Sequence, residues 1–230
     1  MRKIRIETEK MEYSGAEAYK SLRTNLMLCG SDKKVIAVTS CTPGEGKSSV
    51  TLNLAMSLAE TGRRVVLIDA DLRKSVLLGR VHVREAIRGL THFLAGQEQL
   101  TDVICSTNVR GFYVVFAGPV PPNPAELLGG QRFSKMLEVL RETYDYVLID
   151  TPPLGSVIDS AVIAQKCDGV VLVIEAGSIS YRFAQSVKEQ MEKTGCPILG
   201  TVLNKVNLHK QGYYGKYYGK YYGKYGEQQA

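Results

Sequence analysis

The fold of this protein is decided by one stretch, Val35-Ile36-Ala37-Val38-Thr39-Ser40-Cys41-Thr42-Pro43-Gly44-Glu45-Gly46-Lys47-Ser48. Its first six residues are apolar or β-branched and lead into small residues, which predicts a buried strand over 35–40. From Lys47 to Glu60 the apolar residues recur at helical spacing, and Gly62 supplies a stop signal. A strand that passes through a glycine loop directly into a helix is the setting of a phosphate-binding loop.

The loop has residue types suited to holding phosphate. Glycines allow backbone N–H groups to approach the phosphates, Lys47 can reach the β and γ oxygens, and the Ser48 hydroxyl can ligate Mg²⁺. The strict pattern has glycine where this chain has Cys41, but the Gly-Lys-Ser core is intact. The alternative is a glycine turn before an amphipathic helix. The predicted nucleotide contacts are Pro43, Gly44, Glu45, Gly46, Lys47, Ser48 and Ser49.

Further apolar runs of strand length recur along the chain, separated by helical stretches such as 133–141 and 181–193. Near-continuous apolar strands are what a parallel sheet covered on both faces requires. We therefore expect an open, doubly wound, mostly parallel α/β sheet, in which ligands bind beyond the carboxyl ends of the strands. These predicted strands span 64–69, 113–116, 146–150, 170–174 and 198–203.

Three carboxylates follow predicted strands. Asp69 and Asp71 leave the strand over 64–69 with alternate spacing, so both side chains can face one metal and phosphate site. Asp150 ends a second strand, where a direct or indirect Mg²⁺ ligand is expected. A lone aspartate after a strand is more often a cap or turn residue, but three of them beside a phosphate loop favour a site. The pattern leaves open which carboxylate binds the metal and which acts as a base.

The last predicted strand is followed by Asn204-Lys205-Val206-Asn207, which resembles the base-reading loop of GTPases. Guanine specificity there needs a carboxylate, and Asn207 is neutral. Adenine is therefore the better match, with Asn204 as a candidate reader of its amino group. A polar cap at the strand end is an equal alternative for Asn204.

Length, charge and cysteine content set the protein class. The 230 residues suit one α/β domain, and the formal charge is +6. Five cysteines form no CxxC pair, which favours reduced thiols in a cytosolic protein over a disulfide framework. No apolar run has the length of a signal peptide or a membrane span. Any action at a membrane would therefore require another component to hold the protein there.

The C-terminal tail repeats a Tyr-Tyr-Gly-Lys unit, so that seven of the thirteen tyrosines fall within residues 213–225. The repeat matches neither a helix face nor a stable strand and has no aliphatic residues for a core. Residues 208–230 also carry four lysines against one glutamate. Such a tail can be a modification substrate, a stacking surface, or a membrane or partner contact. Its candidate phosphoacceptors are Tyr213, Tyr214, Tyr217, Tyr218, Tyr221, Tyr222 and Tyr225.

A predicted helix near the start places Glu17, Lys20 and Arg23 along one side at three-residue spacing. These charges can pair with a neighbouring subunit. On these residues alone, a solvated face is the more common outcome.

Taken together, the chain resembles the bacterial tyrosine kinases of capsule and exopolysaccharide biosynthesis, in the form of the separate cytoplasmic kinase of Gram-positive bacteria. The resemblance runs from Glu17 to Lys205 and includes the tyrosine cluster. It rests on several motifs in the right order: 17–26, the phosphate loop 39–48, Asp69-Ala70-Asp71-Leu72-Arg73, Pro121-Pro122-Asn123-Pro124-Ala125-Glu126-Leu127-Leu128 and Asp150-Thr151-Pro152-Pro153.

This resemblance implies a P-loop NTPase fold of the ParA/MinD-like branch that uses ATP and Mg²⁺. Lys47 would contact the phosphates, Ser48, Asp71 and Asp150 would organise Mg²⁺, and Asp69 would be the base for the tyrosine hydroxyl. The family's self-association motif has arginine where this chain has Lys20, which keeps the charge but loses the bidentate fork. The implied organisation is a helical self-association segment (1–33), a kinase domain (34–207) and a disordered tyrosine-rich tail (208–230).

The resemblance also implies partners and a place in the cell. A transmembrane regulator of polysaccharide chain length would activate the kinase and recruit it from the cytoplasm to the inner face of the membrane. The kinase would form a homo-oligomer, with a ring expected, would phosphorylate its tail between subunits, and would be opposed by a tyrosine phosphatase. No nucleic-acid partner is expected.

Two other protein classes compete with this interpretation. A ParA or MinD-like ATPase switch would bind ATP without phosphorylating protein, but that class normally has lysine where this chain has Thr42. A non-enzymatic module could instead stack its Tyr-Lys repeats on single-stranded nucleic acid. Phosphate on the tail would separate the kinase from both alternatives.

Overall fold

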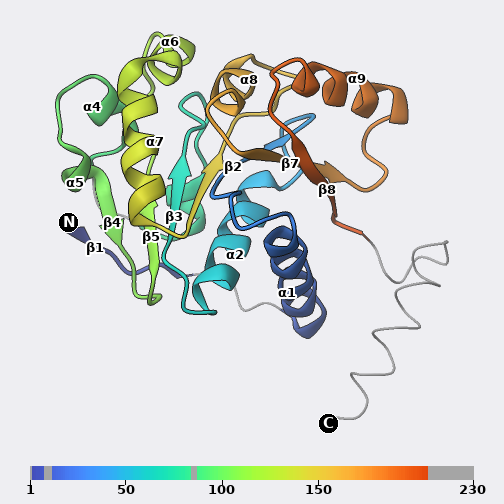
Figure 1. Ribbon diagram of the computed structural model, residues 1–230, viewed down its shortest axis with the longest axis horizontal. Helices are drawn as coiled ribbons and strands as arrows, with labels where there is room; N and C mark the ends of the chain where they lie inside the picture. Colours follow the sequence, from blue (N-terminus) through green and yellow to red (C-terminus); the bar gives the residue numbers. More distant parts are fainter. Residues whose placement is uncertain (1, 8–11, 84–86, 207–230) are drawn as a thin grey trace.

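Eight strands form one sheet in the order β1-β4-β5-β3-β6-β2-β7-β8 in a computed structural model that describes residues 2–7, 12–83 and 87–206 (Figure 1). All neighbouring strands run parallel except β4 and β5, which are antiparallel. The predicted doubly wound, mostly parallel sheet is therefore confirmed. The strands are β1 (Arg2–Lys3), β2 (Val35–Ser40), β3 (Val65–Asp69), β4 (Ile104–Ser106), β5 (Phe112–Val115), β6 (Tyr146–Asp150), β7 (Gly169–Glu175) and β8 (Ile198–Asn204).

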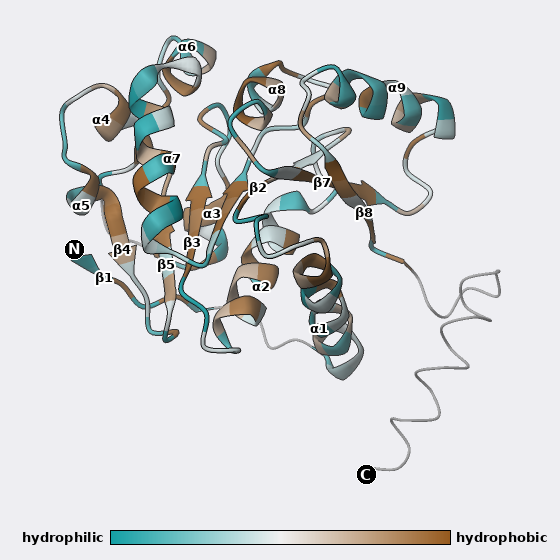
Figure 2. Ribbon diagram, viewed as in Figure 1, coloured by the Kyte–Doolittle hydropathy of each residue, from teal (hydrophilic) through white to brown (hydrophobic). Residues whose placement is uncertain are grey.

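Alternate residues of the central strands enter two separate cores, one on each face of the sheet. In β2, Val35 and Ala37 pack into one core while Ile36 and Val38 pack into the other, and all four are buried. This follows from the two-residue period of a strand, and it explains why strands covered on both faces have continuously apolar sequences. In Figure 2 the central strands, such as β3, are accordingly largely brown, whereas α7 and α9 carry teal hydrophilic residues.

The helices divide between the two faces. One core takes residues from α1 (Tyr13–Leu28), α2 (Lys47–Ala59) and α3 (Leu77–Arg80). The other core takes residues from α4 (Leu90–Leu94), α5 (Leu100–Val103), α6 (Pro124–Gly129), α7 (Gln131–Thr143), α8 (Asp159–Ala164) and α9 (Tyr181–Glu192). Among the described residues, no helix combines the length and the apolar character needed to span a bilayer.

The sequence predictions of individual elements are largely confirmed, with strand ends shifted by at most one residue. The strand predicted over 113–116, for example, lies at Phe112–Val115. Two strands were not predicted: β1, two residues long, and β4, three residues long. Both are too short to show a period. The segment 1–33 therefore contributes a strand to the sheet as well as the predicted helix, and α1 packs against α2.

Candidate active site

The carboxyl ends of β2, β3 and β6 bring the predicted site residues together. β3 and β6 are adjacent and parallel, and their register places Asp69 directly opposite Asp150. Asp71 follows two residues beyond Asp69, and the phosphate loop leaves β2 on the other side of β6. Residues from three distant parts of the sequence thus meet at one edge of the sheet, as expected for an open α/β fold.

The phosphate loop depends on two glycines in left-handed conformation. Gly44 has φ +89° and Gly46 has φ +88°, a region that other residues rarely adopt. Gly46 is the N-cap of α2, and its carbonyl accepts the hydrogen bond from the Val50 N–H at 2.9 Å. The first N–H groups of a helix have no intrahelical partner, so the beginning of α2 can donate to an anion.

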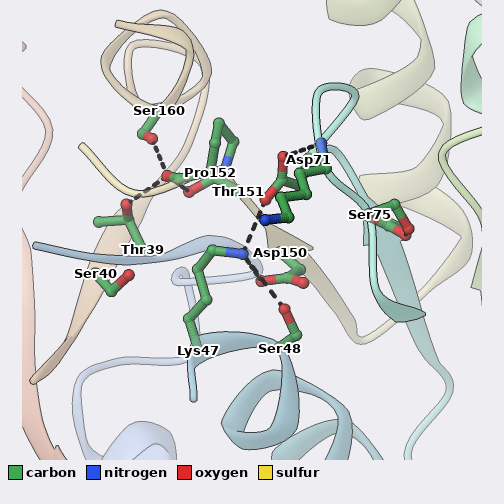
Figure 3. Close-up of polar contacts among 12 residues, drawn as sticks. Thr39, Ser40, Lys47, Ser48, Asp71, Ser75, Asp150, Thr151, Pro152 and Ser160 are labelled. Carbon is green, nitrogen blue, oxygen red and sulfur yellow. Dashed lines mark hydrogen bonds and ion pairs between the residues drawn. The ribbon is translucent and has the colours of Figure 1, made fainter. Parts of the chain in front are cut away.

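Lys47 lies at the centre of the site. Its Nζ is 3.1 Å from Asp71 Oδ2 and 3.5 Å from Asp150 Oδ1, and it donates to Ser48 Oγ at 3.3 Å (Figure 3). Burial lowers the pKa of Lys47, but the facing carboxylates of Asp150 and Asp71 outweigh this effect and raise the pKa above its ordinary value. The amine is therefore a fixed positive charge beside the loop.

Asp69 has a pKa well above the usual value of an aspartate. Its side chain is fully buried, and Ser75 Oγ donates a hydrogen bond to its Oδ2. Burial and the neighbouring Asp150 raise the pKa of Asp69 to about 7, although the bond from Ser75 opposes the shift. Burial likewise raises the pKa of Asp150, against the lowering effect of Lys47. A group with pKa near 7 can both accept and release a proton at neutral pH.

The donor set suits Mg²⁺ held together with phosphates. Among the described side chains, Asp69 Oδ1 and Asp150 Oδ1 are buried without a hydrogen bond, although Lys47 Nζ lies 3.5 Å from the latter. Such orphaned oxygens are costly unless a cation or donor satisfies them. The described residues contain no group of three or more metal-binding His, Cys, Asp or Glu side chains. Mg²⁺ commonly uses one or two carboxylates plus water and phosphate oxygens, so this finding is compatible with it.

Glu45 and Asn204, two of the predicted nucleotide contacts, also make hydrogen bonds that hold the phosphate loop in place. The Glu45 carboxylate is buried and accepts from the N–H of Thr42 at 2.7 Å and from the N–H of Glu175 at 3.2 Å, so it ties the loop to the end of β7. The Asn204 Nδ2 donates to the Glu45 carbonyl at 2.9 Å. The amide nitrogen of Asn204 is therefore bound to the loop. An adenine amino group would donate to Oδ1 of the same amide, so this contact is compatible with both a strand-end cap and an adenine reader.

The turn after Asp150 is held by hydroxyl groups that the sequence analysis did not select. The Pro152 carbonyl accepts from Thr39 Oγ1 at 2.9 Å, from Thr151 Oγ1 at 3.3 Å and from Ser160 Oγ (Figure 3). These bonds join β2, the turn and α8, and so fix the backbone that follows Asp150.

An ion pair that the sequence analysis also missed supports the segment after Asp71. Arg73 binds the Asp159 carboxylate with both ends of its guanidinium group, at 2.8 Å and 2.9 Å. Asp159 is fully buried at the start of α8. Arg73 belongs to a motif in the sequence, but its partner is 86 positions further along the chain, and no local signal connects the two.

The remaining predicted residues lie away from this centre or outside the described chain. On α1, Lys20 Nζ pairs with Glu17 Oε1 at 2.6 Å. Arg23 instead donates to the Ser57 carbonyl of α2 at 2.7 Å. The seven tail tyrosines, from Tyr213 to Tyr225, lie outside the described residues.

Known proteins resemble this chain in sequence and in fold. A family model described as an AAA domain matches residues 33–194. The tyrosine-protein kinase CpsD of Streptococcus agalactiae is 48% identical over 191 residues, which cover 83% of this chain and 83% of CpsD. The solved kinase domain of the Escherichia coli tyrosine kinase ETK is 31% identical with a TM-score of 0.81, covering 90% of this chain and 85% of that one.

A more distant structure defines the wider fold. MinD from Pyrococcus horikoshii OT3, solved in complex with Mg-ADP, is 26% identical with a TM-score of 0.64, and the match covers 79% of this chain and 72% of MinD. The kinase domain of ETK is closer by both measures. Because nearly half of the aligned residues match CpsD over more than four fifths of both chains, this chain belongs to the bacterial tyrosine-protein kinase family.

Proposed function

We propose that this protein is an ATP- and Mg²⁺-dependent autokinase that phosphorylates the tyrosines of its own C-terminal tail and thereby regulates capsular or exopolysaccharide polymerisation and export. One observation carries the proposal: the Lys47 amine lies between Asp71 and Asp150, at 3.1 Å and 3.5 Å, beside the glycine loop that begins α2. The tyrosine-kinase relatives support the reaction type.

The loop and its lysine bind the phosphates. Backbone N–H groups of the turn 43–49 surround the β and γ phosphate oxygens, and Lys47 adds a positive charge that turns from the carboxylates to the phosphates when ATP is present. Ser48, Asp71 and Asp150 supply the hard oxygen ligands for Mg²⁺. Mg²⁺ held by these residues would neutralise negative charge on the transferring phosphoryl group.

The transfer itself needs a proton acceptor. The phenol oxygen of a tail tyrosine forms a bond to the γ phosphorus as the bond from that phosphorus to the β-γ bridging oxygen breaks, and the phenol proton passes to Asp69. A free phenol has a pKa of about 10, so a nearby base assists at neutral pH. The pKa of Asp69, raised by burial to about 7, suits this role.

Membership of the tyrosine-kinase family supports a proposal for how the subunits assemble and which partners act on them. We place phosphoryl transfer between subunits of a ring assembled through Glu17, Lys20 and Arg23 of α1. A transmembrane regulator of polysaccharide chain length would recruit the kinase to the inner face of the membrane and activate it, and a tyrosine phosphatase would reverse the reaction. Complete phosphorylation would reverse the positive charge of the tail, since each phosphate adds about −1.5 to −2.

The test is a map of phosphorylated residues. The purified chain is incubated with ATP, Mg²⁺ and an activating fragment of the regulator. It is then cut after glutamate residues, which keeps the tyrosine repeat in one peptide, and the peptides are analysed by mass spectrometry. We expect phosphate within 213–225, and none in Lys47→Met protein treated identically. ATP hydrolysis without phosphate on the tail would contradict the kinase assignment.

That result would support a second candidate, an ATPase switch of the MinD type. The similarity to MinD over 79% of the chain favours the shared nucleotide-binding fold. In such a protein, ATP would control association with another surface, and the tail would remain unmodified. The same phosphosite map therefore separates the two functions.

A further inference from the structure

Two carbonyl groups of the phosphate loop accept hydrogen bonds from side chains at the end of β8 and directly after it. Asn204 Nδ2 donates to the Glu45 carbonyl at 2.9 Å, and Lys205 Nζ donates to the Gly44 carbonyl at 2.8 Å. The donors come from consecutive residues that lie about 160 positions away in the sequence. Both carbonyls therefore point toward β8.

The same two residues are themselves fixed. Lys205 Nζ also pairs with Glu175 Oε2 at 2.9 Å, and the Asn204 carbonyl accepts from the Ala176 N–H at 2.9 Å. Glu175 closes the network, because its N–H donates to the Glu45 carboxylate. Lys205 has φ +56°, a left-handed conformation that is unfavourable for lysine and persists only where surrounding contacts hold it.

Gly46 shows how closely this network approaches the loop. A Cβ atom at Gly46 would lie 2.2 Å from Asn204 Nδ2, so only glycine leaves room for the amide. By contrast, a Cβ atom at Gly44 would meet nothing within 4 Å. The close contact with Asn204 thus occurs at Gly46, the N-cap of α2, and not at Gly44.

We propose that Asn204 and Lys205 are positioning residues that orient the phosphate loop for nucleotide binding. In a tight turn the peptide units that direct their carbonyls outward direct their N–H groups inward, and anion-binding loops depend on inward N–H groups. By binding the Gly44 and Glu45 carbonyls, the two side chains stabilise this orientation before the nucleotide arrives. The inference rests on the proposed ATP-dependent function and adds the residues that prepare its binding loop.

This role is distinct from reading the base. A reader of adenine would discriminate ATP from inosine triphosphate, which carries the same ribose and triphosphate but lacks the amino group. A positioning residue acts on the binding of the phosphates, which both nucleotides share. Its loss therefore lowers the affinity for both nucleotides by the same factor. The two roles therefore give different results for one variant.

The experiment measures the affinities of magnesium ATP and magnesium inosine triphosphate for the full chain by calorimetry. We expect Asn204→Ala and Lys205→Met each to lower the affinity for both nucleotides by about tenfold, which corresponds to the loss of one net hydrogen bond. In steady-state autophosphorylation, the KM for ATP should rise by a similar factor while kcat changes less than about twofold. Lys205→Arg retains a cationic donor and should recover most of the affinity.

The matched control is Lys188→Met, which removes an exposed lysine that pairs with Glu192 on α9, away from the loop. It should leave both affinities unchanged. Unchanged affinities in the Asn204 and Lys205 variants would overturn the proposal, as would a loss confined to ATP in Asn204→Ala, which would make Asn204 a base reader. Lower thermal stability with unchanged affinity would also overturn it. Because binding is measured without phosphoryl transfer, these outcomes are separate from a failure of the kinase assignment.

Discussion

Asp69 and Asp150 lie directly opposite each other on the adjacent parallel strands β3 and β6, both fully or almost fully buried. Within the described chain, one oxygen of each carboxylate has no hydrogen bond. Burial raises the pKa of both carboxyl groups, and the neighbouring Asp150 adds to the rise at Asp69. A proton or a bound cation would relieve the cost of burying these two carboxylates.

In Asp69→Asn, the rate of autophosphorylation should no longer rise with pH around pH 7, because the titrating base is absent. In the wild type, the base must be deprotonated, so kcat/KM should rise as the pH passes the Asp69 pKa of about 7. The measurement is the initial rate of tail phosphorylation between about pH 5.5 and 8.5. Asp102→Asn, which changes an exposed carboxylate on α5, should keep the wild-type profile.

The stability of the same variant tests the sign of the pKa shift. A carboxyl group whose pKa is raised on folding stabilises the fold at low pH and loses that contribution as the pH rises through the folded value. Asp69→Asn should therefore raise the melting temperature relative to wild type above about pH 7 and have less effect near pH 4. A difference that instead grows toward low pH would contradict the raised pKa.

Lys47→Met should remove activity and destabilise the protein. The variant leaves Asp71 and Asp150 without their cation, and loss of one partner of a buried pair costs about 3 kcal/mol. Phosphorylation of the tail should fall by at least about 100-fold. Urea unfolding at neutral pH and the phosphorylation rate measure the two effects. Lys166→Met removes a lysine that donates to Ser134, remote from the loop, and should leave the rate unchanged.

Gly46→Ala should be more destabilising than Gly44→Ala. Both glycines have positive φ, which costs alanine about 1–2 kcal/mol, but only the Cβ at Gly46 would collide with Asn204. Adding Asn204→Ala to Gly46→Ala should recover part of the lost stability in urea unfolding and none in the Gly44→Ala background. Equal costs for the two glycine variants would show that the Asn204 contact is absent in solution.

Arg73→Met should destabilise the protein by roughly 1–3 kcal/mol, because it leaves the buried Asp159 carboxylate without its bidentate partner. Without this ion pair the segment that carries Asp71 should be less ordered, so the phosphorylation rate should also fall. Adding Asp159→Asn removes the uncompensated charge and should restore part of the stability. Arg182→Met, at an exposed position of α9, should have an effect within about 0.5 kcal/mol in the same urea unfolding assay.

Much of the fold was predictable because its central strands carry their own signal. The apolar runs of β2, β3, β6 and β7 are continuous since both faces of each strand are buried. The short strands β1 and β4 have no such signal, and the antiparallel pairing of β4 with β5 depends on how the chain returns to the sheet edge. The sequence therefore predicted the architecture and missed one edge of it.

The sequence by itself determined the chemical groups of the site: a glycine loop ending in Lys47 and Ser48, and aspartates at two strand ends. Local spacing and periodicity suffice for this. Only the tertiary structure decided which groups meet: Asp69 faces Asp150 across two strands, Arg73 finds Asp159, and Asn204 reaches the phosphate loop. These contacts join residues far apart in the chain, and the resulting burial, which alters the pKa of Asp69, exists only once the sheet has formed.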